Sequence, residues 1–181
     1  ILTCWGDGGH HQSTASLFPP LIHAARACWE GGDEAPIDLA AEVDALFFPD
    51  NPAGNGRAIC ELGRIDSLLP FPNHNQSFLH KAFFAPEADL PTLIASTTPE
   101  TLEEVVAALQ AIRTESAAPG IRLSQQMSLW AAGRCLAGEC PERVSGISLH
   151  ELKEDFRRIW LSESRPGGLE DSLARFPGDE V

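Results

Sequence analysis

Residues 1–9 read ILTCWGDGG, a short apolar run that ends in a tryptophan and in an acid bracketed by glycines. The apolar run predicts a strand, and the glycines after it predict a sharp turn with room for a ligand. An indole offers a flat apolar face to a sugar ring, and a carboxylate accepts hydrogen bonds from hydroxyl groups. Trp5 and Asp7 are therefore candidate sugar-binding residues. A buried strand tryptophan before an ordinary Asp-Gly turn would give the same local pattern.

A strand at residues 1–5 needs a partner, because a single strand cannot satisfy its own backbone hydrogen bonds. The rest of the chain reads as helices, so we expect this strand to pair with a sheet that the 181 residues do not supply. A helix is expected next, with Pro19 and Pro20 in its first turn and Gly31-Gly32 at its end. Its apolar stripe consists of Leu21, Ile22, Ala25, Cys28 and Trp29.

Apolar residues at helical spacing dominate the remaining sequence, which predicts a mostly α fold. Residues 49–75 are rich in Pro, Gly and Asn and predict a long connection with one possible short helix around 58–62. A short polar tail is expected after residue 169. Further helices are predicted at about residues 37–47, 76–85, 98–116, 122–137 and 148–162. The tryptophans on the helical stripes are expected in the core: Trp29, Trp130 and Trp160.

The composition narrows the classes of partner. A formal net charge of −13 argues against nucleic acid and against an anionic membrane surface, because both favour basic proteins. The five cysteines, an odd number, favour reduced and mostly buried thiols in a reducing compartment, which predicts a cytoplasmic protein. Cys135 and Cys140 are five residues apart with no second pair of similar spacing, so neither a metal nor another cofactor is expected.

Two segments, one near each end of the chain, resemble glycoside hydrolase family 20. The first is Trp5-Gly6-Asp7, followed by LFPPL at 17–21 and an Ala-rich helix. The second is FRRIWLSESRPGGL at 156–169, which is similar to a closing helix with Arg-x-x-Trp and then an Asn-Lys/Arg-Pro-x-Gly turn. Both are typical of the bacterial β-N-acetylhexosaminidase branch whose last barrel strand reads Trp-Gly-Asp. The helices between them match that branch in layout only.

This resemblance implies a division of the chain into three parts. Residues 1–32 would be the last strand and helix of a (β/α)8 catalytic barrel, 33–97 a connecting segment with short helices, and 98–181 a helical C-terminal region. Sites of this fold lie at the C-terminal ends of the strands. By resemblance, Trp5 would form one wall of the pocket for a terminal N-acetylhexosamine, and Asp7 would bind hydroxyls on the far side of the ring.

The resemblance also implies substrate-assisted retaining hydrolysis, in which the acetamido oxygen of the substrate attacks the anomeric carbon. In that family an Asp-Glu pair on an earlier strand orients the acetamide and protonates the leaving group, and this sequence does not contain that strand. Asp33-Glu34 and Asp179-Glu180 have the right letters, but they follow a helix stop and lie in the tail, so they are expected to be solvated. We therefore expect the 181 residues alone to be inactive, with the missing N-terminal barrel portion as their partner.

The chain departs from the family pattern at Gly9-His10-His11, where Gly-Ala-Glu is more usual. Adjacent histidines in a turn are more often exposed to solvent than bound to a ligand, so both are expected at the surface. They could also touch the aglycone side of the substrate. A second interpretation belongs to another class of protein: a non-catalytic helical interaction module that docks the Trp5 strand on a partner.

Overall fold

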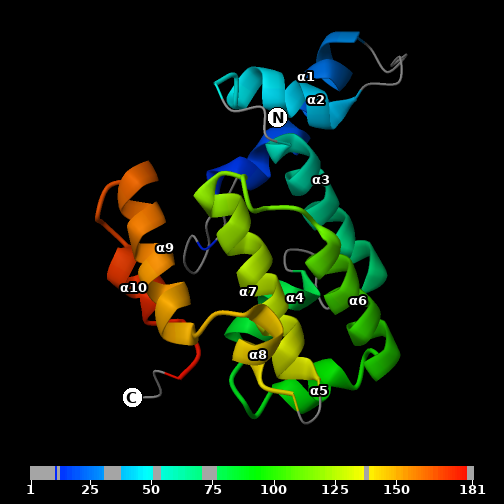
Figure 1. Ribbon diagram of the computed structural model, residues 1–181, viewed down its shortest axis with the longest axis vertical. Coiled ribbons are helices and arrows are strands. Elements are labelled where there is room, and N and C mark those ends of the chain that lie inside the picture. Colours follow the sequence, from blue (N-terminus) through cyan, green and yellow to red (C-terminus); the bar gives the residue numbers. More distant parts are fainter. Residues whose placement is uncertain are drawn as a thin grey trace.

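Helices dominate the structure, a computed structural model (Figure 1). It describes residues 11, 13–30, 38–50, 54–70, 77–136 and 139–178. Within these ranges there is no β-strand, so the predicted mostly-α class is confirmed, while the strand expected at 1–5 lies outside the described residues. No described helix is both long and apolar enough to cross a membrane. The elements are η1 (Thr14–Leu17), α1 (Phe18–Glu30), α2 (Leu39–Phe47), α3 (Asn55–Ile65), η2 (Asp66–Leu68), α4 (Phe78–Phe84), α5 (Leu90–Ile94), α6 (Pro99–Ala111), α7 (Pro119–Cys135), α8 (Pro141–Ser145), α9 (Leu149–Glu163) and α10 (Leu169–Leu173).

Helix α7 lies at the centre of the fold and packs against α4, α6, α8 and α9. The chain runs along α6, back along α7 and forward again along α9, so α6 and α9 are both antiparallel to α7 (Figure 1). The side of α7 that faces the core buries Ile121, Leu129, Trp130, Ala132 and Cys135. Helices α6, α7 and α9 correspond to the helices predicted at 98–116, 122–137 and 148–162, and they bury their apolar stripes in one core.

Local capping signals set the first residues of α6 and α9. The Thr98 hydroxyl accepts a hydrogen bond from the Thr101 N–H at 3.2 Å, and Pro99 occupies the first turn of α6. At α9 the Ser148 hydroxyl accepts from the Glu151 N–H, while the Glu151 carboxylate accepts from the Ser148 N–H. Caps of this kind each contribute about 1 kcal/mol, which explains why the sequence located these two helix starts well.

Helix α4 supplies the most deeply buried aromatic side chains. Phe78 and Phe83 are each 1% exposed, and Phe83 meets Phe176 edge to face with ring centroids 5.2 Å apart. Arg134 of α7 holds the end of α4, because its guanidinium donates to three carbonyl oxygens there. These belong to Ala82, Phe83 and Ala85, at 2.8, 2.9 and 3.0 Å. The helix predicted at 76–85 is thus confirmed, and a cation at its C-terminal end stabilises it.

Helix α3 is longer and more central than the sequence predicted. The predicted connection over 49–75 is wrong for residues 55–65, which form an 11-residue helix. Gly54 precedes it with a left-handed φ of 82°, and Asn55 is fully buried. The Asn55 Oδ1 accepts a hydrogen bond from the Ala118 N–H at 2.8 Å. Glycine and asparagine therefore serve a helix start and a buried contact here, rather than a loop.

Gly56 allows α3 to approach α2 closely. A Cβ at this position would lie 2.0 Å from the Ala40 carbonyl oxygen and 3.0 Å from the Val43 Cβ. The Gly56 N–H also donates a hydrogen bond to Asp44 Oδ1 at 2.8 Å. Any larger residue at this crossing must push the two helices apart.

Gly56→Ala is therefore expected to lower the free energy of unfolding by about 1–3 kcal/mol. Gly63→Ala is the matched control on the same helix, because nothing lies within 4 Å of a Cβ at Gly63. That control should raise the free energy of unfolding by roughly 0.5–1 kcal/mol, since alanine is the better helix former. Urea unfolding of the two variants measures the difference, and equal midpoints would contradict the close α2–α3 contact.

The apolar stripe of α1 is mostly exposed. Ile22 is buried, but Trp29 is 92% exposed. The other stripe residues are exposed as well: Leu21, Ala25 and Cys28. The prediction that Trp29 lies in the core is wrong, because none of the residues that the structure describes covers this side of α1. Of the other two predicted core tryptophans, Trp130 is buried and Trp160 is half-buried.

The described cysteines are free thiols, and most of them are not buried, contrary to the prediction. Cys28 and Cys140 are exposed, Cys60 is half-buried and Cys135 is buried. Burial raises the pKa of the Cys135 thiol to about 11, so this thiol is protonated and unreactive at neutral pH. Cys4 lies outside the described residues.

The residues after α9 do not form a polar tail. Helix α10 and the turn after it bury Leu169, Leu173 and Phe176. The Phe176 ring centroid lies within 5.8 Å of three other aromatic rings, those of Phe83, Phe84 and Phe156. The expectation of a polar tail is wrong, because three apolar residues at a spacing of four and three form one buried face among polar neighbours.

Candidate functional site

Trp5 and Asp7, the two predicted sugar-binding residues, lie outside the described residues. His11, four residues after Asp7, is the first residue that the structure describes. The surroundings of His11 bear on Asp7 only through the length of the chain between them, because four residues span at most about 14 Å. Those surroundings are built by α4, α9 and α10, which are distant in the sequence.

His11 is buried, which corrects the expectation that the adjacent histidines are exposed; His10 lies outside the described residues. The His11 Nε2 lies 2.9 Å from the Ser172 carbonyl oxygen and donates to it in the tautomer that carries the proton on Nε2. Three phenylalanine rings surround the imidazole. Their centroids lie 4.1 Å (Phe84), 5.8 Å (Phe156) and 6.1 Å (Phe176) from the imidazole centroid. An aromatic cluster of these four rings therefore holds the N-terminal segment.

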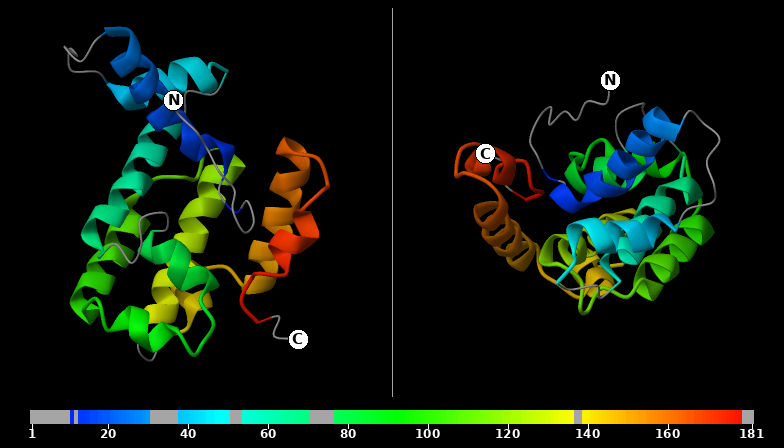
Figure 2. Two further views of the ribbon diagram at one scale, coloured as in Figure 1. Left: turned by 180° about the vertical axis from the view of Figure 1, so that it is seen from behind. Right: turned by 90° about the horizontal axis from the view of Figure 1, so that it is seen from above.

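A second contact ties the same segment to α9. The Thr14 hydroxyl donates a hydrogen bond to the Glu163 carboxylate at 3.1 Å. Gly120 at the start of α7 allows the close approach, because a Cβ there would lie 2.3 Å from the Ser13 Oγ. Figure 2 shows the described N-terminal segment in blue beside the orange and red C-terminal helices. The two ends of the described chain thus form one structural unit.

The Arg-x-x-Trp motif of α9 closes the turn into α10. The Trp160 indole N–H donates to the Arg165 carbonyl oxygen at 2.8 Å. Gly168 has a left-handed φ of 83°, which glycine adopts without strain, and a Cβ there would lie 3.7 Å from the Trp160 ring. Arg157 pairs with Glu170 of α10 at 3.2 Å. The residues that carry the family resemblance at this end therefore place α10 against α9.

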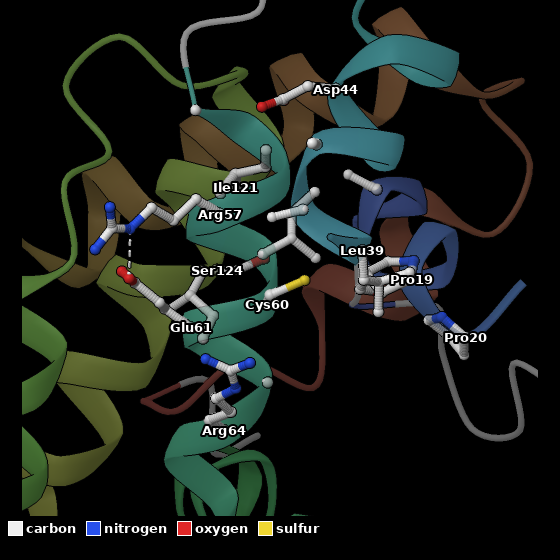
Figure 3. Close-up of a pocket in the computed structure, with 18 of the residues that line it drawn as sticks. Pro19, Pro20, Leu39, Asp44, Arg57, Cys60, Glu61, Arg64, Ile121 and Ser124 are labelled. Carbon is white, nitrogen blue, oxygen red and sulfur yellow. Dashed lines mark hydrogen bonds and ion pairs between the residues drawn. The ribbon is translucent and has the colours of Figure 1, made fainter. Parts of the chain in front are cut away.

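An open groove of about 1130 Å³ lies beside α3 (Figure 3). One stripe of α3 lines it with Arg57, Glu61 and Arg64, and Arg57 is ion-paired with Glu61 at 2.8 Å. Cys60 is the thiol of the groove, and burial raises its pKa, which keeps it protonated at neutral pH. Apolar residues of α1 and α2 also line the groove, among them Pro19, Pro20, Leu39 and Ala40. Such a groove can bind a surface that carries both charged and apolar groups. Among the described residues it holds no activated nucleophile.

Among the described carboxyl groups, that of Asp66 has a raised pKa. Burial raises it, and a hydrogen bond from Ser77 lowers it in part. A raised pKa suits a general acid, but Asp66 does not line the groove beside α3. The predicted solvated pairs Asp33-Glu34 and Asp179-Glu180 lie outside the described residues. Over the described ranges, no group of three His, Cys, Asp or Glu side chains could hold a metal ion.

His80 lies beside the aromatic cluster, with its ring centroid 6.3 Å from that of His11. Burial lowers the pKa of His80 below its ordinary value, and the charge of Arg175 lowers it further. A histidine whose pKa is lower in the folded state binds fewer protons there than in the unfolded chain. Its contribution to stability is therefore full above the ordinary pKa and is lost as the pH falls through the folded pKa.

We accordingly expect the free energy of unfolding to fall between pH 7 and pH 5, and to fall less steeply in His80→Gln. The matched control is His150→Gln, because His150 is exposed on α9. Urea unfolding at a series of pH values gives the slopes. A His80→Gln slope equal to that of the unaltered chain would contradict this role of His80.

Compared with protein-family models, with curated proteins and with solved structures, the chain matches none of them. Any resemblance of the chain to a family therefore rests on its sequence motifs alone.

Sequence reasoning missed the role of His11 and of α10. The signal for α10 was present, since Leu169, Leu173 and Phe176 have helical spacing. Nothing in the local sequence points from His11 to a carbonyl oxygen 161 residues away.

Proposed function

We propose that the chain is the C-terminal part of a family 20-like β-N-acetylhexosaminidase, to which it supplies Trp5 and Asp7 as sugar-binding residues. The substrate is a terminal β-linked N-acetylglucosamine or N-acetylgalactosamine. The Asp-Glu pair that performs the acid chemistry comes from barrel residues outside this 181-residue sequence. The chain by itself has no turnover.

The observation that carries the proposal is the packing of His11, which follows the Trp5-Gly6-Asp7 motif, against Phe156 of the closing segment and against the residues just after that segment. His11, four residues after Asp7, donates to the Ser172 carbonyl oxygen and packs on Phe156 and Phe176. Phe156 begins the closing segment, and Trp160 of that segment fastens the turn into α10. In a glycosidase such an arrangement would brace the sugar-binding strand end with the C-terminal helices.

The exposed side of α1 supports the barrel part of the proposal. A helix that follows a barrel strand packs an apolar side against the strands, and its other side faces outward. Trp29 is 92% exposed and Leu21 is 36% exposed, and both belong to the apolar stripe predicted for α1. Large exposed apolar residues that share one side of a helix usually mark a contact surface. The strands of the barrel would cover this surface in the complete enzyme.

In the proposed reaction the acetamido oxygen of the substrate attacks the anomeric carbon while the bond to the leaving oxygen breaks. The acid of the barrel gives its proton to that oxygen, and water then opens the oxazolinium intermediate with retention. Trp5 would hold the apolar face of the ring, and the Asp7 carboxylate would accept hydrogen bonds from ring hydroxyls. These contacts keep the acetamide in line for attack, and such positioning is worth several powers of ten in rate.

The experiment is a substrate comparison with the product of the complete gene. Chromogenic N-acetyl-β-glucosaminide and N-acetyl-β-galactosaminide are offered beside the plain β-glucoside, which lacks the acetamide. We expect release from at least one N-acetyl substrate and release from the glucoside at least about a hundredfold slower, because only the former carries the nucleophile. Equal rates on the two classes, or no release from either N-acetyl substrate, would overturn the proposal.

The exposed side of α1 also suits the second candidate function, a non-catalytic interaction module. In that case Trp29 and Leu21 would contact a separate protein rather than a barrel. The two functions differ in what precedes Ile1 in the gene. The glycosidase requires a barrel with an Asp-Glu pair there, and the module does not.

A further inference from the structure

A second groove, of about 950 Å³, is lined by α3 and by the C-terminal end of α6 with the residues that follow it; we call it the α3–α6 groove. Its charged residues are Arg57, Glu61 and Arg64 of α3, and Arg113 and Glu115 after α6. The three from α3 also line the groove beside α3, so they form a charged edge that the two grooves share. Positive charge exceeds negative charge in the α3–α6 groove, although the chain has a formal net charge of −13.

The arginines of this groove keep most of their hydrogen-bond donors available. Arg57 donates through Nε to Glu61 at 2.8 Å, which neutralises Glu61 and leaves both terminal amino groups of Arg57 without a partner among the described residues (Figure 3). Arg64 and Arg113 are exposed, and neither is ion-paired within the part of the chain that the structure describes. A guanidinium presents its donors in a planar fork that matches a carboxylate. The groove therefore offers three guanidinium groups to an anionic ligand.

Much of the remaining lining is apolar. Ala58 and Ile65 come from α3, and Ala108, Ala111 and Ile112 come from the end of α6. An inorganic anion has nothing to bury on such a surface, whereas a peptide with apolar side chains between its acids gains free energy by covering it. The lining thus favours an acidic peptide over phosphate or polyphosphate.

We propose that the α3–α6 groove binds an acidic peptide segment of a partner protein. Arg57 and Arg64 are seven residues apart, which is about 10 Å along a helix. A polyproline II segment repeats its side chains on one side every third residue, at intervals of about 9 Å. Acids at every third position of such a segment would therefore meet successive arginines, and the residues between them would contact the apolar lining. This binding requires no sugar hydrolysis and does not depend on the proposed function.

The test measures fluorescence anisotropy of a labelled peptide with the purified 181-residue chain at physiological ionic strength. The probe carries glutamate at every third position with leucine and alanine between, and a second probe has glutamine in place of each glutamate. We expect the acidic probe to bind about tenfold more tightly than the glutamine probe, because three exposed ion pairs each contribute a few-fold. Arg64→Ala and Arg113→Ala should each weaken its binding about two- to fivefold. Arg143→Ala is the matched control and should bind as the unaltered chain does, because Arg143 is exposed on α8 and lines neither groove.

Glu61→Gln gives a readout of the opposite sign, which a loss of folded structure cannot imitate. It releases Arg57 from its ion pair, so the affinity for the acidic probe should rise about two- to fivefold. Circular dichroism of each variant verifies that the helices are kept. No binding of the acidic probe, equal binding of the two probes, or an unchanged affinity in the double variant Arg64→Ala and Arg113→Ala would overturn the proposal. Displacement of the labelled probe by polyphosphate as effectively as by the unlabelled probe, at matched charge, would assign the groove to inorganic anions and overturn the peptide as its ligand.

Discussion

Phe83→Ala is expected to lower the free energy of unfolding of the chain by about 3–5 kcal/mol. Phe83 is 1% exposed and contacts the rings of Phe84, Trp130 and Phe176, which belong to α4, α7 and the turn after α10. Removal of its ring would leave a cavity where three parts of the core meet. Urea unfolding followed by circular dichroism measures the loss.

The control is Trp29→Ala in the same chain. It deletes an even larger aromatic side chain, but one that is 92% exposed, so the change should stay within about 0.5 kcal/mol. Comparable losses in the two variants would show that the core is not where the structure places it. In the complete enzyme the Trp29 variant should lose more stability than in the isolated chain, because the proposed barrel covers this residue.

Asp7→Ala is expected to reduce kcat/KM of the complete enzyme on an N-acetylhexosaminide by about a hundredfold. A carboxylate that accepts hydrogen bonds from ring hydroxyls holds the sugar in place, and each such charge-assisted bond is worth roughly 1.5–3 kcal/mol. The fold should not change, which an unshifted melting temperature would verify. Asp89→Ala is the matched control, since Asp89 is exposed and its side chain makes no capping bond. A full rate in Asp7→Ala would remove this residue from the site.

Local signals allowed the sequence to predict the helices at the centre of the fold. Thr98 and Ser148 supply caps that act within three residues, and the stripes of α6, α7 and α9 repeat over several turns. By contrast, α3 begins after a glycine in a stretch rich in Pro, Gly and Asn, where propensity favours a loop. Its stability comes from contact with α2 and α7, which local reasoning does not see.

The same distinction explains the errors at Trp29 and His11. An apolar stripe predicts that one side of a helix is covered, but it does not say which part of the protein covers it, and for Trp29 the described residues do not. A histidine in a turn is usually exposed, but Phe84, Phe156 and Phe176, all distant in the sequence, surround the His11 imidazole and bury it. The exposure of each side chain depends on which distant parts of the protein reach it, rather than on its own neighbours in the sequence.

We propose that this chain completes a glycosidase without carrying its acid chemistry. The most direct measurement is the initial rate of chromogen release from an N-acetyl-β-glucosaminide or an N-acetyl-β-galactosaminide by the complete gene product and by the purified 181-residue chain, at equal molar concentration. We predict clear release by the complete product on at least one of the two substrates, and a rate indistinguishable from buffer for the isolated chain on both. Reproducible release by the isolated chain, or none by the complete product on either substrate, would contradict the account.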